Sequence, residues 1–361
     1  MWRSRDIFAM MALAAVLTGC ASVPGIKPGK TALAGPRTET VFVASTREGN
    51  GGDPAGLSYA VYDVAVPPSH RPGDEPNLPV VRVDPASDFL MAGERGFKSA
   101  SSFRNAVAAE AISVSASPPE VLVFVHGFNT TLQKSLARMA QIGNDFDLPS
   151  AQVLYNWPTE RRILAYLNDT RRAAEARDGL IELLRSLAAS RTERIVLVGY
   201  SMGAAIVVDA LARMREERQT GPFAKLDVVL LSPDMDLEQF RQRARGIGSL
   251  PRPLVVYGSH KDLPLQMVAR FVADGRPRLG ALPDPDLLSD IDMTYVDVAD
   301  VAHTGYGHFA VASAPALLAA INAMPKPDLV GFATRAAGAI PGATVSRHGL
   351  MTYILLPKSA K

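Results

Sequence analysis

From residue 120 onward, the chain alternates short apolar runs with longer segments in which apolar residues recur at helical spacing. The apolar runs are EVLVFVHG (120–127), AQVLYNWP (151–158), ERIVLVGY (193–200), KLDVVLLSPDMD (225–236), RPLVVYGSHKD (252–262) and DMTYVDVAD (292–300). Helical spacing is clearest over 170–190 and 201–218, and the last predicted helix covers about 314–324. Strands that are apolar on both faces and separated by helices predict an α/β fold with a mostly parallel, doubly covered sheet.

The segments on either side of this pattern are less regular. TVFVAST (40–46) and SYAVYDVAVP (58–67) are predicted strands, whereas 67–119 is rich in Pro, Ser and Gly and favours one helix over 101–112. In the tail, MTYILLP (351–357) is predicted as an edge strand. We therefore expect strands and loops over 37–119, the α/β core over 120–324 and a C-terminal extension over 325–361, with the first two in the same domain.

The first 36 residues do not continue this pattern. Residues 1–19 carry two arginines and then a short apolar run, which is typical of a signal peptide and too short for a membrane span. They end in Leu17-Thr18-Gly19-Cys20, which resembles a bacterial lipobox with Cys20 as the lipidated residue; Cys20 is also the only cysteine. Residues 20–36 would form a tether. By analogy with bacterial lipoproteins, we expect a lipid anchor in the outer membrane that faces the periplasm; the alternative is an ordinary secretory signal.

Composition narrows the function classes further. The chain has 361 residues, of which 47% are hydrophobic, and a formal net charge of +2. This balance argues against a nucleic-acid partner. Metal-binding patterns such as H-E-x-x-H and cysteine pairs are missing from the sequence, and so are glycine-rich loops that bind nucleotide phosphates. Neither a metal nor another cofactor is therefore expected.

The stretch GYSMG (199–203) carries the candidate chemistry. In G-x-S-x-G the chain turns sharply from a strand into a helix, and the serine is exposed above the carboxyl edge of the sheet. Ser201 stands between the predicted strand 193–200 and the predicted helix 201–218, which is the context that the motif requires. Ser201 is therefore the candidate nucleophile; the alternative is a serine that only caps a helix.

A serine nucleophile needs a histidine base and a carboxylate that orients it. In this kind of fold the order along the chain is serine, acid, histidine, so His126 is excluded and is predicted to be a hydrogen-bonded structural residue. His308 is the preferred base and His303 the alternative. Asp262 is the preferred acid and Asp234 the alternative.

Other candidate groups have supporting roles. The oxyanion would be bound by the backbone N–H groups of Phe128 and Met202. Trp157 is expected to be a packed side chain, and the alternative is a place in the substrate pocket. The two histidines outside the core, His70 and His348, are expected to be solvated.

The sequence also resembles a bacterial α/β-hydrolase family of esterase/lipase type that is largely of unknown function. The resemblance rests on FVHGFNTT, YNWP, GYSMGAA, SPDMDLEQF, VVYGSHKDLPLQ, RPRLG and GHFAVAS in this order, and on VFVASTRE and SYAVYDVAVPPSHRPGDEP in the N-terminal part. It implies the α/β-hydrolase fold, with Ser201 as nucleophile, Asp262 as acid and His308 as base. The sequence departs from the family at Tyr200, where members have His.

Together these features predict a serine hydrolase that cleaves a small-molecule or lipid carboxylic ester through an acyl-enzyme. A thioesterase or an amidase would use the same residues. The alternative from another class is a non-catalytic envelope binding protein built on a hydrolase scaffold. The oligomeric state is not predicted.

Overall fold

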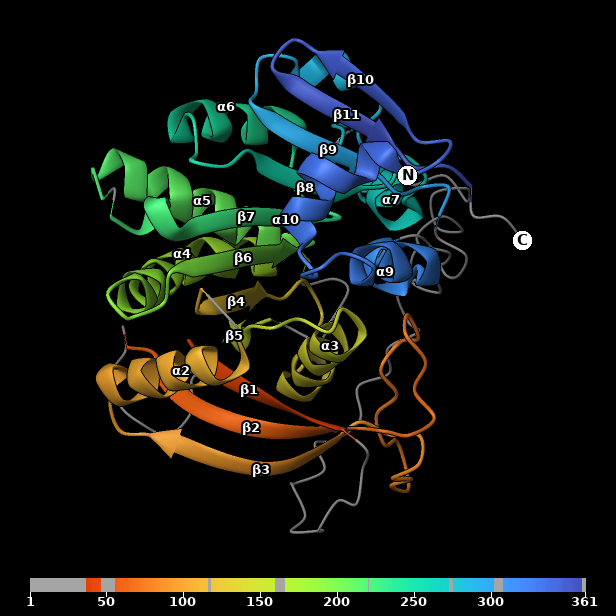
Figure 1. The fold of residues 1–361 in the computed structure, drawn as a ribbon. Helices are drawn as coiled ribbons and strands as arrows, with labels where there is room; N and C mark the ends of the chain where they lie inside the picture. The colour runs from red at the N-terminus through yellow and green to blue at the C-terminus, as the bar shows by residue number, and fades with distance from the viewer. Residues whose placement is uncertain are drawn as a thin grey trace, which may run out of the picture.

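A computed structural model describes residues 37–46, 56–115, 118–159, 166–219, 221–272, 275–301 and 308–358. Eleven strands in these residues form one twisted sheet, in the order β10-β11-β9-β8-β7-β6-β4-β5-β1-β2-β3 (Figure 1). The strands are β1 (Arg37–Ser45), β2 (Ser58–Val66), β3 (Leu90–Phe97), β4 (Glu120–Val125), β5 (Ala151–Asn156), β6 (Arg194–Tyr200), β7 (Leu226–Leu231), β8 (Leu254–Gly258), β9 (Met293–Asp297), β10 (Thr344–His348) and β11 (Met351–Leu355).

The middle of the sheet is parallel and its margins are antiparallel. Neighbours from β11 through β9, β8, β7, β6, β4 and β5 to β1 all pair in parallel. Strands β2 and β3 at one margin, and β10 at the other, pair antiparallel. The prediction of a mostly parallel sheet is confirmed. Because all parallel strands end at the same edge, the loops after β4, β6, β7, β8 and β9 meet there.

Helices cover both faces of the sheet (Figure 1). One face packs against α2 (Ala100–Val114), α4 (Tyr166–Ala188), α5 (Met202–Glu216) and α6 (Leu237–Ile247). The other packs against α3 (Leu132–Asp145), α8 (Ala310–Ser313), α9 (Pro315–Asn322) and α10 (Leu329–Gly331). The remaining elements are α7 (Leu263–Phe271), η2 (Gly221–Lys225), η3 (Leu279–Ala281), η4 (Pro285–Leu288), η5 (Phe332–Ala336) and η6 (Ala337–Ala339).

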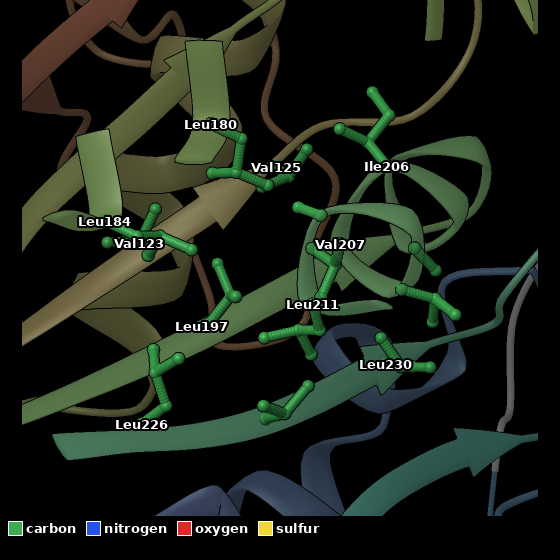
Figure 2. Close-up of a cluster of buried hydrophobic side chains, with 14 of the residues drawn as sticks. Val123, Val125, Leu180, Leu184, Leu197, Ile206, Val207, Leu211, Leu226 and Leu230 are labelled. Carbon is green, nitrogen blue, oxygen red and sulfur yellow. The ribbon is translucent and has the colours of Figure 1, made fainter. Parts of the chain in front are cut away.

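Strand β4 shows how the continuous apolar runs satisfy two cores at once. Val121, Val123 and Val125 belong to the core beneath α4 and α5, whereas Leu122 and Phe124 belong to the core on the other face. Successive side chains of a strand point to opposite faces, so the apolar run after Glu120 supplies both cores. Figure 2 shows Val123 and Val125 of β4 beside Leu184 and Leu180 of α4, and Leu211 of α5 near Leu197 of β6.

Two predictions about the margins need correction. Strand β3 lies in the region expected to be mostly loop; it carries two glycines and no buried residue, so its sequence lacks the apolar alternation of a typical strand. Strand β11 is not the edge strand, because β10 pairs along its outer side and takes that place. The turn between them contains Gly349 at φ +58°, a conformation that favours glycine.

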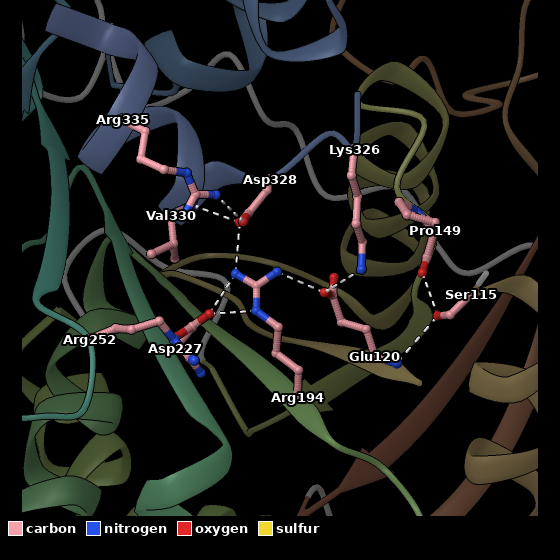
Figure 3. A network of polar contacts seen from close by, with 10 residues as sticks. All are labelled: Ser115, Glu120, Pro149, Arg194, Asp227, Arg252, Lys326, Asp328, Val330 and Arg335. Carbon is pink, nitrogen blue, oxygen red and sulfur yellow. Dashed lines mark hydrogen bonds and ion pairs between the residues drawn. The ribbon is translucent and has the colours of Figure 1, made fainter. Parts of the chain in front are cut away.

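The amino edge of the sheet holds a cluster of charged side chains around Arg194, the first residue of β6 (Figure 3). Arg194 donates to Asp227 through Nε at 2.5 Å, to Glu120 through Nη1 at 2.8 Å and to Asp328 through Nη2 at 2.8 Å. Each carboxylate also pairs with a second cation, and these cations are Arg252, Lys326 and Arg335. The cluster therefore joins the starts of three central strands, β4, β6 and β7, to the segment before α10.

Among the described residues, no helix combines the length and the apolar character needed to cross a membrane. The predicted signal peptide, Cys20 and the tether lie outside the described residues.

Candidate active site

Ser201 lies at the sharp turn between β6 and α5, in a backbone conformation that L-residues rarely adopt. Its φ is +52° and its ψ is −120°. Such a conformation costs about 1–3 kcal/mol and persists only where the surroundings enforce it. Here the Ser201 N–H donates to the carbonyl of Leu231, and its own carbonyl accepts from Ala204 and Asp234. These bonds hold the strained residue from both sides.

The glycines of the motif are needed because the backbone segments lie so close. A β-carbon at position 203 would be 2.3 Å from the carbonyl oxygen of Val125, and one at position 199 would be 2.7 Å from the Cα of Ala204. Only glycine fits both places without moving the backbone. The motif thus brings the start of α5 against the end of β4.

His308 bridges Ser201 and Asp262 (both predicted as its partners). Its Nε2 lies 3.0 Å from the Ser201 Oγ, and its Nδ1 lies 2.8 Å from Asp262 Oδ2. A carboxylate only accepts, so Nδ1 carries the proton toward Asp262 and Nε2 is left as the acceptor for the serine hydroxyl. The geometry is that of a nucleophile, a general base and an orienting acid.

Asp262 is fully buried and both of its oxygens are used. It caps α7: Oδ1 accepts from the Leu265 N–H at 3.0 Å, while Oδ2 faces His308. Capping fixes the rotamer of the carboxylate, and the helix N-terminus favours its negative charge. The acid is therefore held rigidly before any substrate arrives.

The charges around His308 favour its protonated form. Burial alone lowers the pKa of His308, but the charge and the hydrogen bond of Asp262 outweigh it, and the charge of Asp234 adds to them, so that the pKa is raised above its ordinary 6.5. The imidazole side chain is still 24% exposed, so it is partly accessible to solvent.

The alternative candidates occupy other places. Asp234 accepts a hydrogen bond from Arg278 at 2.7 Å, whereas the carboxylate bonded to His308 is that of Asp262. His303 lies outside the described residues. Arg278 belongs to the RPRLG stretch, but no pattern in the sequence indicates a role for it.

The loop after β4 lies directly against the nucleophile. A β-carbon at Gly127 would be 2.9 Å from the Ser201 Cβ, so the backbone that leads into Phe128 passes beside the serine. Met202 follows Ser201 as the first residue of α5. Of the two residues expected to bind an oxyanion, Met202 follows Ser201 in the chain, and Phe128 follows the glycine that lies beside Ser201.

His126 and Trp157 stack on one another and brace this loop. Their ring centroids are 5.3 Å apart with the planes 10° from parallel. Nε2 of His126 accepts from the Trp157 N–H at 3.2 Å, so its Nδ1 is the protonated nitrogen that donates to the carbonyl of Gly127 at 2.9 Å. His126 is a hydrogen-bonded structural residue, as predicted, and Trp157 is fully buried.

The expectation that His70 is solvated was wrong. Its side chain is 3% exposed, and Nε2 lies 2.7 Å from Asp145 Oδ1. His348 is not free in solvent either, because its Nε2 lies 2.9 Å from the Ser346 Oγ and its Nδ1 lies 2.7 Å from Asp286 Oδ1. This second Ser–His–Asp arrangement differs from the first: Asp286 is mostly exposed, and Ser346 lies within the regular strand β10 instead of at a turn.

Within the described part of the chain, no group of three or more His, Cys, Asp or Glu residues has the arrangement needed to hold a metal ion. The chemistry that Ser201, His308 and Asp262 can perform is proton transfer and nucleophilic attack by the Ser201 hydroxyl.

Comparisons with known proteins identify the family of the chain. A family described as alpha/beta hydrolase of unknown function (DUF900) matches residues 101–323, which is more than half of the chain and includes Ser201, Asp262 and His308. The comparison with curated proteins found no match. Among solved structures, a lipase-esterase related protein from Clostridium acetobutylicum is similar over 62% of this chain and 92% of its own, with 16% identity and a TM-score of 0.23, a likeness too weak to support an argument. The family match and the sheet topology together show that this chain belongs to that family of α/β-hydrolases.

Proposed function

We propose that this protein is a serine hydrolase that cleaves carboxylic esters through an acyl-enzyme on Ser201. The observation that carries the proposal is the continuous chain of hydrogen bonds from the Ser201 Oγ through His308 to the buried Asp262. The strained turn at Ser201 supports it, because a serine that merely capped a helix would not need such a conformation, and it makes no side-chain cap hydrogen bond.

The proposed reaction follows from the positions of these groups. Nε2 of His308 takes the hydroxyl proton while Oγ of Ser201 attacks the carbonyl carbon. The resulting oxyanion is bound by the backbone N–H groups of Phe128 and Met202. The imidazolium then gives its proton to the departing alcohol oxygen, and the C–O bond breaks to leave an acyl-serine. A water molecule repeats the sequence and releases the acid.

The raised pKa of His308 predicts how activity depends on pH. Only the neutral imidazole can accept the serine proton, so activity should rise with pH through the pKa of His308 in the free enzyme. The midpoint of this rise in kcat/KM is expected above 6.5. A midpoint below 6.5 would contradict the assignment of a base paired with Asp262.

The first test is labelling with a fluorophosphonate probe, with turnover measured on p-nitrophenyl esters from acetate to laurate. We expect labelling and ester turnover in the wild type, and the loss of both in Ser201→Ala. Ser346→Ala is the matched control, because it removes the serine of the second Ser–His–Asp arrangement and should leave both signals intact. A folded wild type that takes up no probe would instead favour a non-catalytic binding protein.

The same series addresses the substrate class. Preference for long acyl chains would indicate a lipase, and preference for short chains an esterase. Matched thioester and anilide substrates would separate the thioesterase and amidase alternatives, which use the same three side chains.

We further propose that the mature chain begins at a lipidated Cys20 and is anchored in the cell envelope, with the outer membrane as its site. The support is the sequence Leu17-Thr18-Gly19-Cys20 after a basic and apolar leader. Metabolic labelling with an alkyne fatty acid tests it: the wild type should incorporate the label and sediment with membranes, and Cys20→Ala should do neither. A wild type that is secreted without the label would favour the ordinary signal peptide.

A further inference from the structure

A second charged pair lies beside the nucleophile. Nε of Arg278 donates to Asp234 Oδ1 at 2.7 Å, and both side chains are nearly buried, with 11% and 4% of their surface exposed. Asp234 follows β7, and Arg278 directly precedes η3. Burying two charges carries a large desolvation cost, so a buried ion pair beside the nucleophile indicates a role in the function of the site.

Backbone hydrogen bonds tie this pair to Ser201. The Asp234 N–H donates to the carbonyl of Ser201 at 3.1 Å. The segment that carries Arg278 is in turn bonded to the loop after β7, since the N–H groups of Leu279 and Gly280 donate to the carbonyls of Met235 and Pro233 at 2.9 Å each. A displacement of the pair would therefore disturb the strained turn.

The titratable and charged groups around His308 come from several elements. Among the described residues they are Asp262 before α7, Tyr200 at the end of β6, Ser201 just after it, and Asp234 after β7 with its partner Arg278 before η3; Arg138 of α3 lies over the ring of Phe309, the next residue in the chain. Besides Asp262, Asp234 is the carboxylate whose charge favours the protonated form of His308. Asp234 is joined to His308 through Ser201, because its N–H donates to the Ser201 carbonyl and the Ser201 Oγ lies 3.0 Å from His308 Nε2; it is not itself the hydrogen-bond partner of the base.

We propose that Asp234 and Arg278 are positioning residues of the hydrolase: Asp234 stabilises the imidazolium of His308 from a distance and supports the turn at Ser201, and Arg278 holds Asp234 in place. The inference rests on the proposed function, because the imidazolium forms when Ser201 attacks. It assigns Asp234, the alternative acid of the sequence analysis, a role beside Asp262. It also gives Arg278 a role, as the residue that keeps this second carboxylate fixed.

The test measures the titration of His308 directly, by NMR of the full-length protein labelled with 13C at histidine Cε1. His308→Asn identifies the signal. Asp234→Asn should lower the midpoint of the His308 titration by about half a pH unit, since it removes a nearby negative charge. Asp236→Asn is the matched control: Asp236 is a buried carboxylate in the same loop, but it caps α6 and faces Arg276. We expect it to leave the midpoint unchanged.

The coupling between the two residues is tested by the rate of fluorophosphonate labelling. Asp234→Asn and Arg278→Gln should each slow labelling by about tenfold, and the double variant should be no more than about threefold slower than the slower single variant, because both remove one interaction. Arg278→Lys should restore part of the rate, since it keeps a cation near Asp234. Thermal unfolding checks that each variant is folded.

The outcomes separate the two proposals. A wild type that is not labelled overturns the proposed function and, with it, the catalytic purpose of the pair. A wild type that is labelled, with a His308 midpoint that does not move in folded Asp234→Asn, overturns the role of the pair alone. Fully additive effects of the two substitutions on the labelling rate would also overturn it.

Discussion

Strand β6 begins in one charged cluster and ends in another, and the two clusters differ in kind. At its first residue, Arg194 is bonded to three carboxylates, each of which has a further cation. Just after its last residue, Ser201 is hydrogen-bonded to His308, and His308 is hydrogen-bonded to one carboxylate, that of Asp262. In the first cluster, around Arg194, every carboxylate has two cationic partners, and we call it the saturated cluster. In the second, Ser201, His308 and Asp262 form a single chain of hydrogen bonds, and we call it the linear cluster.

The pKa shifts describe the same difference. At the amino edge, burial lowers the pKa of Arg194, but Asp328 and Glu120 more than compensate, so the guanidinium stays charged; the pKa of Asp328 is lowered in turn, because Arg194 outweighs its burial. Both partners are locked in their charged forms. At the carboxyl edge, burial lowers the pKa of His308, but Asp262 and Asp234 outweigh it and raise the pKa above its ordinary value.

The two ends of β6 therefore have different roles in the same sheet, one structural and one at the candidate active site. The saturated cluster fixes the starts of β4, β6 and β7 relative to each other, and the linear one leaves an acceptor nitrogen and a strained hydroxyl for a substrate. Substitutions at the two ends of β6 should therefore affect different measurements.

The largest expected effect comes from a substitution that disables the linear cluster without unfolding the protein. Asp262→Asn should lower kcat/KM for ester hydrolysis by about 10⁴, because the amide can hold His308 in the wrong tautomer. Asparagine also caps helices well, so the free energy of unfolding should change little. The measurements are steady-state kinetics and chemical denaturation.

Asp236→Asn is the matched control for this loss of rate. It makes the same chemical change at a helix cap, that of α6, one loop away. It should retain kcat/KM within about threefold. An Asp262→Asn enzyme with nearly full activity would remove Asp262 from the proposed mechanism.

At the other end of β6, Arg194→Met should act on stability instead. It leaves buried Glu120 and Asp227 with one cation each, and breaking a buried ion pair costs about 3–5 kcal/mol of unfolding free energy. Denaturant unfolding measures this loss. The proposed ester hydrolysis by the remaining folded protein should be unchanged, since the cluster lies at the opposite edge of the sheet.

The control for this variant is Arg213→Met on the outer face of α5. Arg213 pairs with Glu217 at i,i+4 spacing, and both side chains are substantially exposed. Exposed pairs contribute about 0–1 kcal/mol, so the loss should be small. Equal losses at Arg194 and Arg213 would show that the amino-edge cluster has no special structural weight.

The two clusters also differ in how far the sequence revealed them. The linear one was accessible because G-x-S-x-G imposes a local geometry and the chain order of the fold restricts the partners, so Ser201, Asp262 and His308 could be named in advance. Their hydrogen bonds could not, because they depend on loops that are separated by tens of residues. The oxyanion donors and the lipid anchor stay predictions.

The saturated cluster gave no such signal. Glu120 and Arg194 precede apolar runs, where a charged residue is usually a solvated strand end, and only the register of β4 with β6 places them side by side. Asp227 was counted within an apolar strand, and Asp328 comes from the tail. The central strands followed from their apolar runs, whereas β3 and the order of β10 and β11 depend on pairing that no local pattern specifies.

Gly203→Ala should affect both the stability of the fold and the reactivity of Ser201. The added β-carbon would lie 2.3 Å from the Val125 carbonyl oxygen and 2.5 Å from that of His126, so backbone must move. We expect a loss of about 1–3 kcal/mol in stability, as for other overpacked sites. Labelling of Ser201 should also slow by at least about tenfold, because the loop that leads to Phe128 is pushed away.

Gly246→Ala provides the contrast for that substitution. Gly246 lies in α6 with open space around its missing β-carbon, so alanine should stabilise the helix by about 0.5–1 kcal/mol and leave labelling unchanged. If Gly203→Ala behaved like Gly246→Ala, the close approach of α5 to β4 would not matter for the site.

The smallest expected effects concern pH, and they have opposite signs at the two edges. The pKa of Asp328 is lowered in the folded state, so its pairing stabilises the protein above its ordinary pKa of 3.8 and is lost as the pH falls through the folded value. The pKa of His308 is raised, so its contribution is fully present below 6.5 and is lost as the pH rises through the folded value. A one-unit difference between the folded and unfolded pKa corresponds to about 1.4 kcal/mol.

Unfolding free energies measured from pH 3 to 9, a range of about six units, would separate these contributions. Asp328→Asn should flatten the fall in stability on the acid side and leave the alkaline side as in the wild type. His308→Gln should do the reverse, flattening the change above pH 6.5. If Asp328→Asn altered only the alkaline side, the charge locking inferred for the amino edge would be wrong, and the two ends of β6 would be more alike than their contacts indicate.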